Sequence, residues 1–171
     1  AGPPGLTIAT SSAGRLFDAM AAIAGIRTEV TFEGQAAMEL EAMCDDRYDG
    51  EYEFRIRETP GAILLDPRPV VRAAVLDRRH GEPAGAIAVR FHRGFARAIA
   101  DLCVKLSKTT GIERVAGGGG AFQNMRLQDE LERRLLDAGL ELYAPERIPA
   151  NDGGIALGQA WVVSNRFSNH A

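Results

Sequence analysis

Two glycine-rich turns carry the residues of this sequence whose types and spacing best suit chemistry. Gly117 to Gly120 follow the apolar pair Val115–Ala116, and Gly153–Gly154 follow Asn151 and Asp152. Each turn lies between an expected strand and an expected helix. Backbone amides can approach a ligand closely at glycine, and a following helix directs free N–H groups and the positive end of its dipole toward it. The pattern therefore indicates a site for a phosphate or another small anion.

Each of these features also has a purely structural alternative. The glycine run could be a tight turn that needs positive φ, because it lacks the Lys-Ser or Lys-Thr of a P-loop and the spacing of a dinucleotide-binding turn. Asp152 could offer its oxygens to a metal or a metal-bound phosphate, or it could cap the last helix. Asn124 could likewise cap the helix after the glycine run or bind a nucleotide base or sugar.

The cysteines and histidines are weaker candidates for catalysis or metal binding. Cys44 and Cys103 lie among apolar neighbours, which favours buried structural thiols and a cytoplasmic location. His80 lies in a charged loop, and His170 lies in the polar C-terminal segment. We expect His92, inside the longest helical pattern, to be a packed or surface residue. The histidines lack the spacing of paired metal ligands on a helix.

The elements that must position these residues follow from the hydrophobic pattern. Apolar residues at helical spacing predict helices over residues 11–25, 31–44, 68–79, 83–111 and 122–139, and a last apolar helix after the turn within 151–164. Alternating or short apolar runs predict strands over residues 51–57, 62–66, 113–117 and 140–145. Strands that alternate with helices favour the α/β class.

Composition limits the partners that we expect. The 171 residues are 46% hydrophobic and 25% charged, which is ordinary for a soluble globular protein. A net charge of −3 does not favour nucleic acid. No apolar run approaches the roughly 20 residues that are needed to span a bilayer. We therefore expect neither a nucleic acid nor a membrane as partner. Residues 1–10 are expected to be a linker or an artificial chain edge, and residues 165–171 a flexible tail.

Five segments together resemble the C-terminal part of the HypF family, the carbamoyltransferases of nickel–iron hydrogenase maturation. In the family's order and rough spacing, they are SSAGRLFDAMAAIAGI, FEGQAAMELE, FHRGFARAIAD, GGGAFQN and IPANDGGIALGQA. The resemblance covers about residues 11–163. It implies an α/β fold, in which residues 11–164 form the C-terminal lobe of a two-lobed, actin-like (ribonuclease H-like) ATPase domain, with a mixed sheet flanked by helices.

The resemblance also implies an activity. Upstream domains of such proteins make carbamoyl-adenylate from carbamoyl phosphate and ATP, and the two-lobed domain passes the carbamoyl group to the C-terminal cysteine of the partner HypE. The implied cofactors are ATP or carbamoyl-adenylate and a divalent metal (Mg, Fe or Zn) completed by histidines outside this chain. We therefore expect this lobe to be inactive without the upstream domains.

Site residues carry over by position within the matched segments. Asp152 matches the family's metal-coordinating aspartate. The implied nucleotide-binding residues are Asp18, Gly34, Glu39, Gly118, Gly119, Gly120 and Asn124. Two segments depart from the family pattern. Residues 118–121 are Gly-Gly-Gly-Ala where Ser-Gly-Gly-Val is usual, and residues 91–94 are Phe-His-Arg-Gly where Phe-His-Asn-Thr is usual. The second departure replaces an amide with a cation.

Other functions use the same lobe architecture. An antibiotic-type O-carbamoyltransferase would have a hydroxyl acceptor in place of a thiol. A noncatalytic nucleotide-binding or docking module would bind without transfer. A generic actin-like kinase is less favoured, because this lobe shows neither a matching phosphate-1 motif nor a catalytic base.

Overall fold

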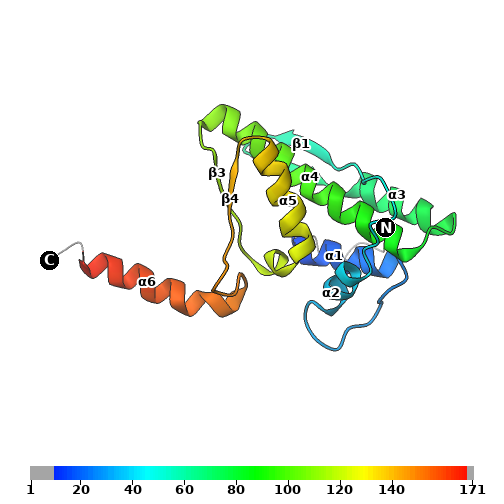
Figure 1. The fold of residues 1–171 in the computed structure, drawn as a ribbon, viewed down its shortest axis with the longest axis horizontal. Coiled ribbons are helices and arrows are strands. Elements are labelled where there is room, and N and C mark those ends of the chain that lie inside the picture. Colours follow the sequence, from blue (N-terminus) through cyan, green and yellow to red (C-terminus); the bar gives the residue numbers. More distant parts are fainter. Residues whose placement is uncertain (1–9, 169–171) are drawn as a thin grey trace.

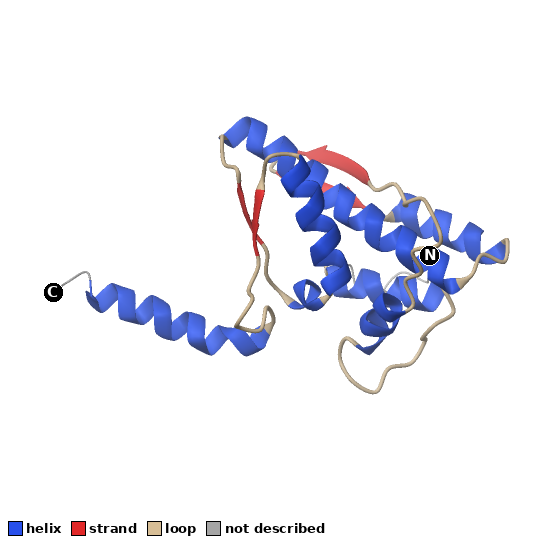
Figure 2. Cartoon of the chain, in the orientation of Figure 1, coloured by secondary structure: helices blue, strands red, loops and turns tan. Residues whose placement is uncertain are grey.

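The apolar stripe expected over residues 83–111 forms helix α4 (Ala84–Thr110), and the other elements of the body are arranged around it (Figure 1). The computed structural model describes residues 10–168. Helices and two small sheets alternate along the chain (Figure 2). The remaining helices are α1 (Ala13–Ile23), α2 (Gln35–Ala42), α3 (Arg68–Arg79), α5 (Met125–Asp137) and α6 (Ile155–Ser168). Two short 3-10 helices are η1 (Gly120–Gln123) and η2 (Asp152–Gly154).

The core of the body lies along the N-terminal two thirds of α4. Alanine and glycine are frequent there, and their small side chains let neighbouring segments approach on all sides. Phe17 of α1 packs edge-on against Phe91 with ring centroids 4.9 Å apart, and Phe91 stacks on Phe95 at 5.9 Å. Leu127 and Leu131 of α5 are also buried in this core. Helices α1, α3 and α5 therefore all pack on α4, and α1 and α5 bring the expected site residues with them.

The strands pair in two separate small sheets. Strands β1 (Arg55–Thr59) and β2 (Ala62–Asp66) form an antiparallel hairpin, and β3 (Arg114–Ala116) and β4 (Glu141–Tyr143) pair in parallel with α5 as the connection. The α/β class is confirmed, and the mixed character comes from one antiparallel and one parallel pair. Within residues 10–168 the strands do not join into the single mixed sheet that we expected.

Two of the element boundaries that differ from the predictions have a local cause. The first strand begins at Arg55 instead of residue 51, because the Tyr52 amide donates to the Arg90 carbonyl oxygen at 3.0 Å and docks this segment on α4. Helix α2 begins at Gln35 instead of residue 31, since Gly34 before it adopts positive φ (+81°). Two other helix ends follow local signals: Ser12 caps α1, and Gly111, the last residue of the range expected for the long helix, follows α4 with φ of +72°.

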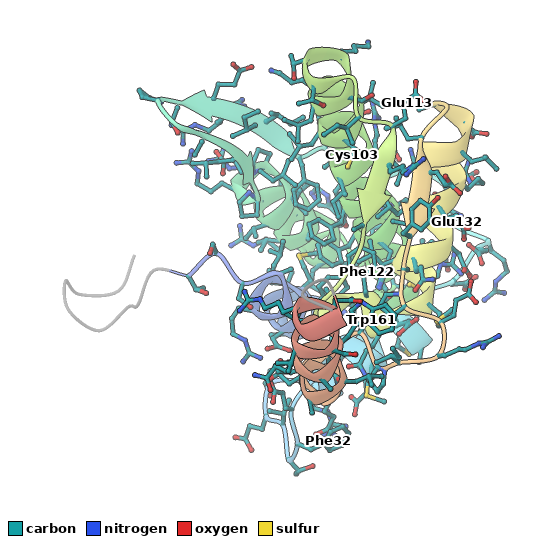
Figure 3. All side chains as sticks on the ribbon, turned by 90° about the vertical axis from the view of Figure 1, so that its left-hand side faces the viewer. Phe32, Cys103, Glu113, Phe122, Glu132 and Trp161 are labelled. Carbon is teal, nitrogen blue, oxygen red and sulfur yellow. The ribbon has the colours of Figure 1, made fainter. Side chains whose placement is uncertain are left out.

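Helix α6 projects away from the body (Figure 1), and Figure 3, drawn from the side of α6, labels Trp161 on it. It packs chiefly against η2, and its apolar side chains are exposed, Trp161 to 70%. The helix continues to Ser168, so the tail boundary expected after residue 164 falls inside it. Most of the expected linker (residues 1–9) and residues 169–171 lie outside the described residues. Within the described part of the chain, no helix is both long enough and apolar enough to span a bilayer.

Candidate functional site

A cavity of about 960 Å³ lies where α1, α2 and the two glycine-rich turns meet. Predicted site residues from four separate segments line it. They are Asp18, Gly34, Gly120, Asn124 and Asp152. Of the other predicted residues, Gly118 and Gly119 are exposed on the turn beside Gly120. The folded chain thus brings most of the predicted residues to one hollow.

The glycines of the first turn are needed for different reasons. A Cβ at Gly117 would lie 2.2 Å from Cε1 of Phe122, so tight packing requires glycine there. Gly119 adopts positive φ (+89°), which favours glycine. A Cβ at Gly118 or Gly120 would meet no heavy atom within 4 Å, and neither residue has positive φ. The turn itself explains only the glycines at 117 and 119, and the backbone at 118 and 120 faces open space.

Several backbone amides that we expected to be free already have partners. The Gly119 amide donates to the Ala150 carbonyl oxygen at 2.7 Å, which ties the two glycine-rich turns together. At the start of α5, the Arg126 amide donates to Oε1 of Glu41 at 3.0 Å. The Leu127 amide donates to Oδ1 of Asn124 at 2.7 Å. The anion-binding capacity expected at the start of α5 is therefore largely used by the protein's own side chains.

The second turn is capped by Asn151 and not by Asp152. Oδ1 of Asn151 accepts a hydrogen bond from the Gly153 amide at 3.0 Å. Asp152 begins η2, and its exposed side chain borders the cavity. The structure thus gives the capping role to the preceding residue, and the Asp152 carboxylate is accessible from the cavity.

Asn124 is 7% exposed and takes up the capping role that we considered for it. Its Nδ2 atom lies 3.0 Å from Nε2 of His92, which is fully buried. Burial lowers the pKa of His92 to about 4, so the ring is neutral at physiological pH. The expectation that His92 is a packed residue is confirmed. Its link to Asn124 had no signal in the sequence, because the two residues lie on different helices.

The cysteines are structural, as expected, but they are half-buried and not fully buried. Both Cys44 and Cys103 are free thiols. The Cys44 Sγ atom lies 3.2 Å from Nδ1 of His92, and burial raises the pKa of its thiol to about 12. A thiol that stays protonated at neutral pH is a poor nucleophile. The pair of Cys44 and His92 is therefore part of the packed core and not a catalytic dyad.

The charged residues of the cavity wall are mainly acidic. Asp18, Glu33, Glu41 and Asp152 border it, and Arg15 forms an ion pair with Asp18 at 3.0 Å. Among the described residues, no group of three or more His, Cys, Asp or Glu side chains is placed to hold a metal ion. The side chains present here therefore do not form a metal centre, and we assign no chemical step to a metal.

Helix periodicity separates Glu39, which the resemblance implied as a site residue, from Glu41, which it did not. Gly34, Met38 and Glu41 line the cavity, and their three- and four-residue spacing places them on one face of α2. Glu39 lies off that face and binds Arg27 through two contacts of 2.6 and 2.7 Å. The nucleotide-binding role implied for Glu39 stays a prediction, while Glu41 is a cavity residue that helical spacing from Gly34 could have revealed.

Comparison with known proteins identifies the family of this chain. Residues 5–159 match the family model described as "Carbamoyltransferase, Kae1-like Domain, second subdomain". The chain is 43% identical over 156 residues to a carbamoyltransferase HypF of Rhizobium leguminosarum bv. viciae, and 38% identical over 151 residues to that of a Synechocystis strain. These two matches include 90% and 88% of this chain, respectively, but only 19% of the length of each relative.

A solved structure of a HypF protein has the same fold as this chain. The fold matches full-length HypF in a phosphate- and nucleotide-bound form with a TM-score of 0.84 and 40% identity. That match covers 91% of this chain and 20% of the solved one. The chain therefore spans about a fifth of the length of the relatives it matches.

Proposed function

The chain belongs to the HypF carbamoyltransferase family, and from that premise we propose that its cavity binds the nucleotide end of carbamoyl-adenylate. The observation that carries the proposal is the convergence of α1, α2 and both glycine-rich turns on one hollow of about 960 Å³. This volume is in the range of ordinary small-molecule sites. A solved relative described as phosphate- and nucleotide-bound supports the same ligand class.

Different residues of this chain would contact different parts of the nucleotide. The backbone at Gly118 and Gly120 has no neighbouring heavy atom where a side chain would be, so phosphate oxygens can approach it closely. Asn124 offers a side-chain N–H, and Asp18 and Gly34 also border the cavity. Because the charged residues of the wall are mainly acidic, we propose that the nucleotide enters with a divalent cation whose ligands come mainly from outside this chain.

In the complete protein, we propose that the bound adenylate delivers its carbamoyl group to the C-terminal cysteine of HypE. The thiolate sulfur forms a bond to the carbamoyl carbon, and the bond from that carbon to the adenylate phosphate oxygen breaks, which releases AMP. Upstream domains make the adenylate from carbamoyl phosphate and ATP. The role of this lobe is to hold and orient the leaving nucleotide.

A glycine substitution tests the nucleotide site directly. Gly118→Ala adds a methyl group in open space, so the fold is expected to be unaffected, but the methyl group blocks close approach of a phosphate. We expect Mg-ADP to bind about tenfold more weakly, which corresponds to about 1.4 kcal/mol. Amide chemical shifts during titration would give both the affinity and the location of binding.

The matched control is Gly158→Ala on α6, where an added Cβ also meets nothing within 4 Å. This variant is expected to bind Mg-ADP as the unmodified chain does. Equal affinity for Gly118→Ala and Gly158→Ala, or shift changes that avoid residues 118–124, would contradict the proposed site.

A further inference from the structure

A buried chain of hydrogen bonds links the long helix to the candidate nucleotide site. Nδ1 of His92 lies 2.8 Å from the Ala88 carbonyl oxygen, and Nε2 lies 3.0 Å from Nδ2 of Asn124. Oδ1 of Asn124 lies 2.7 Å from the Leu127 amide nitrogen. We propose that His92 is a positioning residue, which fixes the orientation of the Asn124 side chain and so presents one of its N–H groups to the nucleotide. The last part of this inference rests on the proposed function.

The direction of each hydrogen bond follows from the groups at the two ends. The Ala88 carbonyl only accepts, so Nδ1 of His92 carries the proton and Nε2 of the neutral ring is left as an acceptor. The Leu127 amide only donates, so it faces the carbonyl oxygen of Asn124. Both ends therefore require the same orientation of the Asn124 amide. Rotating that amide by half a turn would set two acceptors against each other at one end and two donors at the other.

This orientation has a consequence for the cavity. The side-chain NH₂ of Asn124 has two protons, and Nε2 of His92 accepts one of them. Asn124 also lines the cavity, so its second N–H is available as a donor in a fixed direction. A fixed donor suits the acceptor atoms of a nucleotide, which are ring nitrogens, ribose oxygens and phosphate oxygens. Without His92, the amide would be held only by its bond to the Leu127 amide.

The surroundings keep the His92 ring neutral and in place. Phe17 of α1 and Phe91 of α4 contact the ring edge to face, with centroids 5.4 and 5.7 Å away. Cys44, which follows α2, is a protonated thiol beside Nδ1. The positive charge of Arg126 on α5 further disfavours an imidazolium. Burial and Arg126 together outweigh the Ala88 carbonyl, whose hydrogen bond alone would raise the pKa of the ring, so the ring is neutral.

The departure of this chain from the family pattern at residue 93 leaves the link intact. Arg93 donates to the Tyr48 carbonyl oxygen at 2.8 Å and to Asp46 at 3.0 Å. These partners belong to the loop after α2, and neither of them is His92 or Asn124. The cation introduced at this position therefore acts on that loop and does not compete with His92.

Two substitutions of similar polarity separate positioning from packing. In His92→Gln, the longer amide places an oxygen acceptor near the position of Nε2 and can hold Asn124. In His92→Asn, the shorter amide can donate to the Ala88 carbonyl but does not reach Asn124. We expect His92→Gln to bind Mg-ADP within about threefold of the unmodified chain, and His92→Asn about tenfold more weakly.

A spectroscopic measurement tests the link without any nucleotide. In the unmodified chain, nuclear magnetic resonance should detect a scalar coupling across the hydrogen bond from Nδ2 of Asn124 to Nε2 of His92. It should also detect slow solvent exchange of one Asn124 side-chain proton. We expect His92→Gln to keep the slow exchange and His92→Asn to lose it.

The outcomes distinguish this inference from the proposed function. Absence of the coupling in the unmodified chain, or equal weakening of Mg-ADP binding by both variants, would overturn the positioning role. Suppose that the unmodified chain shows the coupling but does not bind Mg-ADP. The proposed function is then overturned, and with it the idea that Asn124 presents an N–H group to the nucleotide. The coupling would still support the inference that His92 orients the Asn124 side chain. If either variant fails to fold, the coupling in the unmodified chain still decides whether the link exists.

Discussion

A methyl group added at Gly94 should destabilise the body strongly. Gly94 lies on the buried side of α4, where the backbone of Tyr52 crosses the helix. A Cβ at this position would lie 2.0 Å from the Tyr52 carbonyl oxygen and 2.9 Å from both its carbonyl carbon and its amide nitrogen. These neighbours are backbone atoms, so no side chain can rotate away to make room. Gly94→Ala must push the segment before β1 off the helix.

The size of the effect can be worked out from three contributions. Overpacking against backbone should reach the upper part of the usual range, about 3 kcal/mol. Displacing Tyr52 also weakens the hydrogen bond from its amide to the Arg90 carbonyl oxygen, for a loss of about 1 kcal/mol. The higher helix propensity of alanine offsets about 1 kcal/mol. We therefore expect the free energy of unfolding to fall by about 3 kcal/mol.

Urea unfolding followed by far-UV circular dichroism would measure this change. With a slope of about 2 kcal/mol/M, the midpoint should fall by about 1.5 M. Gly14→Ala in α1 is the matched control, because its nearest neighbour would be Oγ of Ser12 at an ordinary 3.6 Å. The control should be neutral or stabilised by up to about 1 kcal/mol. If the midpoint of Gly94→Ala lies close to that of the unmodified chain, the steric reasoning is wrong.

Three further predictions concern buried polar groups. Burial lowers the pKa of His92 to about 4, so the unfolded chain binds the proton first as the pH falls. Stability should therefore decrease by up to about 3 kcal/mol as the pH drops from about 6.5 toward about 4. Urea midpoints at several pH values should show this slope, and His92→Gln should reduce it. In a Cys103→Ser background, Cys44 should react slowly with a disulfide reagent, since its thiol has a pKa of about 12. At about pH 8 the reaction should be at least about a hundredfold slower than after unfolding, and fast reaction would contradict its burial. Tyr52→Phe removes the hydrogen bond of 2.7 Å from the Tyr52 hydroxyl to Asp77. This loss should lower the free energy of unfolding by about 1 kcal/mol, whereas an unchanged urea midpoint would show that the bond adds nothing.

The sequence predicted local features of the fold better than the pairing of its strands. Ser12 and Gly111 mark helix ends through interactions within a few residues, so their roles follow from the chain nearby. The alternation of Tyr52 and Phe54 resembles a strand, but both side chains are buried in the core on α4, and no strand of the described part of the chain pairs with that segment. Whether strands join one sheet or two depends on contacts between distant segments, which hydrophobic periodicity does not encode.

In the candidate site, too, local features were predictable from the sequence and contacts between distant segments were not. The glycine turns, Asn124 and Asp152 could be found because glycine and capping residues have distinct local patterns. Glu39 was chosen over Glu41 from a matched segment, although helical spacing from Gly34 places Glu41 on the cavity side. The link between His92 and Asn124 spans 32 residues and depends on how α5 packs on α4. Only the folded structure could show it.

The position of α6 determines what a common optical probe can report. Trp161 is the only tryptophan in the sequence, and it lies on this exposed helix, which packs chiefly on η2. The buried core extends no further along the chain than β4. An isolated helix of this length is marginally stable in water, so α6 can unfold in a step of its own while the body stays folded. Tryptophan fluorescence should therefore follow the C-terminal helix, and the unfolding of the body will be visible only to probes such as circular dichroism or amide hydrogen exchange in α4.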